Sequence, residues 1–269
     1  MSSRWGLPKR LFQPASLVDL SRIPSGEVNV DKLSLRMQVY RMFPQKAVLD
    51  LFAGRGYLSS LYAPYCWRII CVEKDPEQFH FLERNMRDYK HAVLINDDNM
   101  NVLETLDESN VTYVDFDAYG CPSFQIKKFF EKYPIRQALI ISVTDGMLLN
   151  FRTWSSADLS RYYLQDFYQS LGERYGDHDR YHVTRSLGEY LFEIQRRFID
   201  ILCMRYQAQA NCLYFKVKPS NTVAYSAYLI LPKLVGVADF KRYVGLKELK
   251  QPTQQKTLKI KVTKIGRYV

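Results

Sequence analysis

Short apolar runs alternate with amphipathic segments along the first half of the chain. The apolar runs predict buried strands, and apolar residues spaced three or four apart predict helices. The expected strands span residues 47–52, 68–72, 92–95, 111–116 and 137–143. The expected helices span residues 31–42, 57–63, 76–89, 101–106 and 123–132. This alternation is typical of a mostly parallel sheet with helices on both faces.

The second half of the chain follows a different pattern. Two long helical patterns cover about 157–174 and 183–207. Apolar segments at 213–217 and 223–231 flank the turn Pro219-Ser-Asn-Thr222, which predicts an antiparallel hairpin that completes a seven-stranded sheet. At 257–262 apolar residues alternate with lysines, as in a strand with one basic face. We therefore expect an arm at 1–27, an α/β domain at 28–231 and a C-terminal extension at 232–269.

Positive charge is concentrated at the C-terminal end of the chain. The formal net charge is +10, and residues 231–269 carry ten lysines or arginines against two acidic residues. A nearly neutral body with a basic end predicts a polyanionic partner such as a nucleic acid. We expect Lys256, Lys259 and Lys261 to contact its phosphates. The alternative is an ordinary solvated lysine surface.

The cysteines and the hydropathy argue against several classes of protein. The five cysteines form neither a CxxC pair nor a Cys/His cluster with zinc spacing, so we expect no metal. Most of them lie in apolar surroundings and resemble reduced core thiols, which favours a reducing, cytoplasmic compartment. No apolar run approaches the ~20 residues that a membrane-spanning helix needs.

The segment Asp50-Leu-Phe-Ala-Gly-Arg-Gly56 ends the first predicted strand. A strand that runs into glycines and then a helix allows a ligand to approach the backbone closely. The residues expected to line this turn are Asp50, Phe52, Gly54 and Gly56. The third glycine of a dinucleotide-binding fingerprint is missing, which disfavours NAD.

Acidic residues follow the second and third predicted strands as well. Glu73 follows the second strand, and Asp97 and Asp98 follow the third. Ligands of open α/β sheets bind outside the carboxyl ends of the strands. Glu73 is expected to accept hydrogen bonds from ribose hydroxyls, and Asp97 or Asp98 from an adenine amino group. Without a phosphate-binding loop, this combination predicts an adenosine-containing ligand.

The fourth strand ends in Val114-Asp-Phe-Asp-Ala-Tyr-Gly-Cys-Pro122, which combines acids, an aromatic residue and a turn. The Asp117 carboxylate and the Ala118 carbonyl can accept hydrogens from the exocyclic amine of a base and orient its lone pair. Tyr119 can stack on that base, with Gly120 beside it. Asp115 is expected to face the cofactor.

These segments resemble the S-adenosylmethionine-dependent methyltransferases of class I. DLFAGRG is similar to their glycine motif, CVEKDPE to their ribose-binding acid and NDDNMNVL to their adenine-side acid. The segment from Asp115 to Pro122 most resembles the Asp-x-Asp-Pro-Phe-Gly-Ser-Pro motif of the tRNA guanine-N2 dimethyltransferases, as do 29–34 and 142–148. Ala118 replaces the proline of that motif, and few residues are left for that family's C-terminal domain.

The resemblance implies a Rossmann-like class I methyltransferase fold, the cofactor S-adenosyl-L-methionine, and methyl transfer to an exocyclic amine, with guanine N2 in tRNA favoured. One alternative is a DNA adenine-N6 methyltransferase, for which the Asp-x-x-Tyr pattern and the basic C-terminal segment would serve equally well. A second alternative is a non-catalytic nucleic-acid-binding protein with a degenerate methyltransferase fold, which the alanine at position 118 permits.

Overall fold

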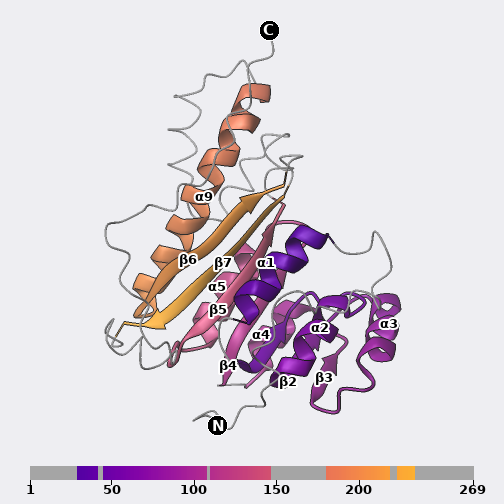
Figure 1. Cartoon of the computed structure of the whole chain (residues 1–269). Coiled ribbons are helices and arrows are strands. Elements are labelled where there is room, and N and C mark those ends of the chain that lie inside the picture. Colours follow the sequence, from indigo (N-terminus) through magenta and orange to yellow (C-terminus); the bar gives the residue numbers. More distant parts are fainter. Residues whose placement is uncertain (1–28, 42–44, 108–109, 147–179, 219–222, 234–269) are drawn as a thin grey trace, which may run out of the picture. The chain divides into compact units, whose positions relative to one another are not determined.

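The computed structural model describes residues 29–41, 45–107, 110–146, 180–218 and 223–233. Within these residues the strands form one seven-stranded sheet in the order β3-β2-β1-β4-β5-β7-β6. β7 runs antiparallel to both of its neighbours, while β1 to β5 pair in parallel. The predicted Rossmann-like class I methyltransferase fold, with its antiparallel C-terminal hairpin, is confirmed (Figure 1).

The strands of the sheet are β1 (Gln45–Asp50), β2 (Cys66–Val72), β3 (Ala92–Ile95), β4 (Val111–Asp117), β5 (Leu139–Asp145), β6 (Ala208–Val217) and β7 (Ala224–Pro232). The helices are α1 (Val30–Tyr40), α2 (Tyr57–Tyr62), α3 (Pro76–Met86), α4 (Asn99–Thr105), α5 (Ser123–Lys132) and α9 (Arg180–Arg205), with the short 3-10 helix η4 at Ala63–Tyr65. β3 and α5 have the bounds predicted from the sequence. The helix expected at about 157–174, the arm and the basic extension lie outside the described residues, except Pro232 and Lys233.

Several boundaries differ from the prediction: α3 ends at Met86 rather than at residue 89, α9 begins at Arg180 rather than at about residue 183, and the starts of β6 and β5 differ as well. β6 begins five residues earlier than expected, because Ala208, Gln209 and Ala210 pair with the end of β7 although their side chains are poor strand formers. β5 begins at Leu139 rather than at residue 137, and the Gln137 side chain instead donates a hydrogen bond to the Val111 carbonyl. In both places pairing with neighbouring strands decides the boundary.

The two faces of the sheet have different chemistry. Alternate residues of β4 point to opposite faces, so Val114 and Phe116 join the apolar core formed with α5 and α9. Tyr113, Asp115 and Asp117 point to the other face, which α1 and α2 cover (Figure 1). The polar face continues onto β5 through Ser142 and Thr144, which pair with Asp115 and Asp117. The candidate site lies where this buried polar layer reaches the carboxyl end of the sheet.

Candidate functional site

The turn after β1 brings the predicted glycines and Glu73 together. The Gly54 N–H donates to Glu73 Oε2 over 2.8 Å, and the Asp75 N–H donates to Glu73 Oε1 over 2.8 Å. The Ala53 N–H also donates to the Val72 carbonyl. Glu73 is therefore fixed beside the glycine turn, and each carboxylate oxygen keeps a further lone pair for a ligand hydroxyl.

Both glycines have conformations that other residues rarely adopt. Gly54 has φ +53° and Gly56 has φ +79°, in the left-handed region. A Cβ on Gly56 would lie 2.5 Å from Leu82 Cδ1, whereas a Cβ on Gly54 would meet no atom within 4 Å. A side chain at position 56 would therefore have to displace Leu82 of α3, while the space beside Gly54 is open to a ligand.

Asp50 lies at the end of β1 and is buried. Its Oδ2 accepts from the Ser59 hydroxyl at 2.6 Å, and its Oδ1 accepts from the Phe52 N–H at 3.3 Å. Burial, reinforced by the negative charge of Asp115, raises the pKa of Asp50 to about 7. Asp50 and half-buried Phe52 therefore shape the turn, and the Asp50 carboxylate is not exposed to a ligand.

The two acids after β3 have different surroundings. The Asp98 carboxylate caps α4 by accepting from the Met100 N–H at 2.9 Å. Asp97 is exposed, and its Oδ1 accepts from the Asp98 N–H and from the Asn101 amide. Asp98 thus has a structural role, and Asp97 is the more accessible of the two.

Asp115 is buried under α1 rather than facing open space. Arg36 Nε donates to both Asp115 oxygens at 3.0 and 2.8 Å, and Arg36 Nη2 donates to Oδ1 at 2.8 Å. The Tyr62 hydroxyl adds a bond to Oδ2 at 2.7 Å. Both the Asp115 and the Arg36 side chains are 0% exposed. Asp115 thus serves as the buried counter-ion of Arg36, and its expected contact with a cofactor stays a prediction.

Asp117 sits one pleat further along the same face and is 14% exposed. Lys32 Nζ donates to Asp117 Oδ2 at 2.7 Å, and the Thr144 hydroxyl donates to Oδ1 at 2.5 Å. Burial opposes its ionisation, but the charges of Arg36 and Lys32 and these two hydrogen bonds outweigh burial and lower the pKa of Asp117 below its ordinary value. Asp117 is therefore an anion and a hydrogen-bond acceptor at neutral pH.

The residues after Asp117 form the outer rim of the site. The Tyr119 side chain is fully exposed, whereas Ala118 is buried. The Gly120 carbonyl accepts from the Gly146 N–H at 2.9 Å, which ties this turn to the end of β5. An aromatic ring thus stands free in solvent two residues after an anionic acceptor.

Lys32, Arg36 and Thr144 surround Asp117, yet none of them had a predicted role. Lys32 and Arg36 are four residues apart and so lie on one side of α1. Arg36 also falls among the apolar positions of the helix, next to buried Met37. A buried arginine needs an anion beside it. The arginine at an apolar position of α1 was therefore a signal in the sequence that could have predicted its pairing with the alternating acids of β4.

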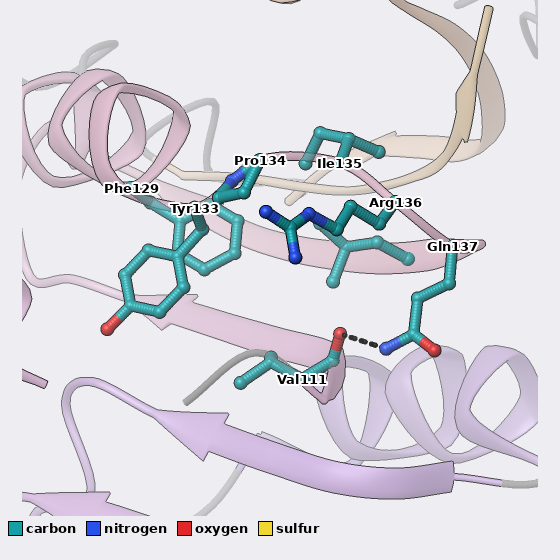
Figure 2. A pocket seen from close by; sticks show the side chains of 8 residues that line it. Val111, Phe129, Tyr133, Pro134, Ile135, Arg136 and Gln137 are labelled. Carbon is teal, nitrogen blue, oxygen red and sulfur yellow. Dashed lines mark hydrogen bonds between the residues drawn. The ribbon is translucent and has the colours of Figure 1, made fainter. Parts of the chain in front are cut away.

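Other features of the described residues do not add to this site. A small hollow lined by Phe129, Tyr133 and Arg136 lies at the amino ends of β4 and β5, opposite the acids (Figure 2). In the described ranges, no three or more His, Cys, Asp or Glu residues are arranged to hold a metal ion. No described helix is both long and apolar enough to cross a membrane. Lys256, Lys259 and Lys261 lie outside the described residues.

Comparison with known proteins finds similarity in fold only. No family model and no curated protein matches the chain. Among solved structures, wild-type Trm5b from Pyrococcus abyssi is 14% identical, with a TM-score of 0.47 over 76% of this chain and 50% of that one. This chain thus spans half the length of that protein. The putative methyltransferase yhhF from Escherichia coli is 14% identical, with a TM-score of 0.48 over 77% of this chain and 90% of that one. M. jannaschii TYW2 in complex with AdoMet is 12% identical, with a TM-score of 0.47 over 79% of each chain. At this distance the likeness identifies neither a reaction nor a substrate.

Proposed function

We propose that the chain is a methyltransferase that moves a methyl group from S-adenosylmethionine to an exocyclic amino group of a nucleic-acid base. The observation that carries the proposal is Asp117, an anionic acceptor at the carboxyl edge of the sheet with exposed Tyr119 beside it. The glycine turn and Glu73 lie at the same edge, after neighbouring strands. This edge of the sheet therefore carries an acceptor for an amine, a ring for stacking and a subsite suited to adenosine, and together they support this reaction.

The residues around the glycine turn fit S-adenosylmethionine. Gly54 leaves open space where a side chain would stand. Glu73 offers the acceptors that ribose hydroxyls need, and exposed Asp97 offers an acceptor for an adenine amino group. When bound, the cofactor supplies an electrophilic methyl group on a sulfonium.

Asp117 orients the amine rather than removing its proton. A carboxylate with a lowered pKa is a weak base, but it accepts hydrogen bonds strongly. An exocyclic amine is a poor nucleophile because its lone pair is delocalised into the ring. Hydrogen bonds to Asp117 and the Ala118 carbonyl would turn that lone pair out of conjugation and stabilise the positive charge that develops on nitrogen. The amine then loses its proton to water.

Guanine N2 in tRNA is the favoured target, because the segment from Asp115 to Pro122 resembles that of the tRNA guanine-N2 dimethyltransferases. The exposed Tyr119 ring suits a base that has left its stack. The basic C-terminal segment suits a polyanionic substrate of either kind, RNA or DNA.

The test is transfer of a radiolabelled methyl group to undermethylated tRNA and to unmethylated DNA, followed by identification of the labelled nucleoside. Label in N2-methylguanosine is the expected result. Label in N6-methyladenine of DNA would keep the chemistry of the site and change the substrate. No label in either nucleic acid, with cofactor still bound, would refute the catalytic proposal.

One observation favours a second candidate, a non-catalytic nucleic-acid-binding protein. Lys32 Nζ lies 2.7 Å from Asp117 Oδ2, where a target amine would otherwise donate. A carboxylate oxygen has two lone pairs, so an amine can bind beside Lys32 or displace it. In a non-catalytic protein, Lys32 and Asp117 would form a permanent ion pair, and the labelling experiment would give no product.

A further inference from the structure

We propose that Thr144 is a positioning residue for Asp117, through a hydrogen-bonded relay that runs from Asp115 through Arg36 to Thr144. The inference deepens the proposed function and rests on it for the catalytic consequence. The relay joins α1 to two neighbouring strands, and it ends on the Asp117 oxygen that does not contact Lys32.

The distances define a single direction for the relay. Arg36 is a permanent cation without acceptor capacity, so its Nη2 donates to Thr144 Oγ1 at 2.8 Å. The Thr144 hydroxyl, having accepted that bond, is free to donate its only hydrogen to Asp117 Oδ1 at 2.5 Å. The buried Asp115 carboxylate holds the guanidinium in place. Arg36 Nη2 donates to both Asp115 Oδ1 and Thr144 Oγ1, whereas the Thr144 hydroxyl has a single hydrogen, which it donates to Asp117 Oδ1. If the hydroxyl turned away, Asp117 Oδ1 would lose this hydrogen bond.

Through Thr144, the relay makes a hydrogen bond to Asp117 Oδ1 that neither Arg36 nor Lys32 makes directly. Arg36 Nη2 lies 3.6 Å from Asp117 Oδ1, beyond hydrogen-bond distance, so Thr144 completes the connection between them. Lys32 contacts the other oxygen from a longer and partly exposed side chain. Thr144 is therefore the group that fixes the plane of the Asp117 carboxylate, and the direction of its lone pairs toward an amine depends on that plane.

Several ionisable groups face Asp117 or interact with it. They are Lys32 and Arg36 from α1, Asp50 from β1, Asp115 from β4 and Tyr214 from β6. A substitution at Thr144 leaves all of these residues in the chain, but Thr144→Val also removes one acceptor of Arg36, which Thr144→Ser keeps. A change in the titration of Asp117 that appears in Thr144→Val and not in Thr144→Ser is therefore attributed to the hydroxyl and its two hydrogen bonds.

The test compares Thr144→Val, which keeps the shape and removes the hydroxyl, with Thr144→Ser, which keeps the hydroxyl. Thr112→Val is a matched control. Thr112 is also a strand threonine whose hydroxyl bonds the neighbouring strand, and it lies at the other end of β4 from Asp117. The full chain is labelled with ¹³C-aspartate, and the Asp117 carboxyl signal is identified by its loss in Asp117→Asn. Its titration is followed by NMR, and the pH profile of kcat is measured in parallel.

We expect a raised pKa for Asp117 in Thr144→Val, so that the acid limb of the kcat profile moves to higher pH. We also expect kcat to fall roughly ten- to a hundredfold, the range for loss of a hydrogen bond to a charged group, with a smaller change in KM. Thr144→Ser should restore both, and Thr112→Val should change neither.

The titration decides the structural part without any turnover. If the wild-type chain methylates nothing, the proposed function fails, and the Asp117 signal still tests the relay: a raised pKa in Thr144→Val supports it, and an unchanged pKa overturns it. If the wild-type chain is active, an unchanged kcat profile in Thr144→Val overturns the proposal even where the pKa has moved.

Discussion

Replacing Arg36 with methionine should destabilise the fold strongly, because it leaves a buried carboxylate without its cation. Arg36 makes three hydrogen bonds to Asp115 and one to Thr144, and both charged side chains are 0% exposed. Breaking a buried pair from one side typically costs ~3–5 kcal/mol. The lower half of that range is expected here. Tyr62 still donates to Asp115, and Arg36 Nη1 is a buried donor without a hydrogen-bond partner among the described residues.

Urea unfolding at pH 7 measures this cost as a change in the free energy of unfolding. Arg196→Met is the matched control, since Arg196 pairs with Asp200 at 3.6 Å on the exposed side of α9 and should cost less than about 0.5 kcal/mol. Adding Asp115→Asn to Arg36→Met should recover part of the loss, because it removes the unpaired charge. If Arg36→Met cost no more than Arg196→Met, the reasoning about this buried pair would be refuted.

Two further stability predictions concern the turn after β1. The pKa of Asp50, raised to about 7 mainly by burial, means that the folded chain holds a proton that the unfolded chain releases near pH 4. The proton bound to Asp50 therefore stabilises the folded chain fully below about pH 4. As the pH rises toward 7, the free energy of unfolding falls by at most about 1.4 kcal/mol per pH unit. Asp50→Asn should remove this loss in urea unfolding between pH 5 and 8, and equal pH dependence in both proteins would contradict it. Gly56→Ala should cost more than Gly54→Ala, because both alanines are strained by a positive φ but only the first meets Leu82, at 2.5 Å. The extra cost should be about 1–3 kcal/mol in the same assay, and equal costs would show that Leu82 moves aside freely.

The fold could be predicted from the sequence because each element carries its own signal. Helix α5 begins after Pro122 and buries Ile126, Phe129 and Phe130. The proline marks its start, and the helical spacing of these apolar residues marks its buried face. The start of β6 carried no such signal. Ala208 and Gln209 are poor strand formers, and they become strand only because β7 lies beside them.

The site could be predicted only in part, for a similar reason. The acids at the strand ends were found because position along a strand is local information. The role of each acid depends on the side chains that pack against it, and these come from parts of the chain that are distant in the sequence. Asp115 and Asp117 are two residues apart on one face, yet Arg36 covers the first completely and Lys32 the second only in part.

The role of the Asp117 carboxylate is tested by measuring methyl transfer by Asp117→Ala together with cofactor binding on the same protein. Asp107→Ala, at an exposed acid after α4, is the control that should behave as the wild-type chain. We expect Asp117→Ala to bind S-adenosylmethionine nearly as well as the wild-type chain, while the rate of transfer falls by on the order of a hundredfold or more. Turnover by Asp117→Ala at the wild-type rate would show that this carboxylate does not orient the amine.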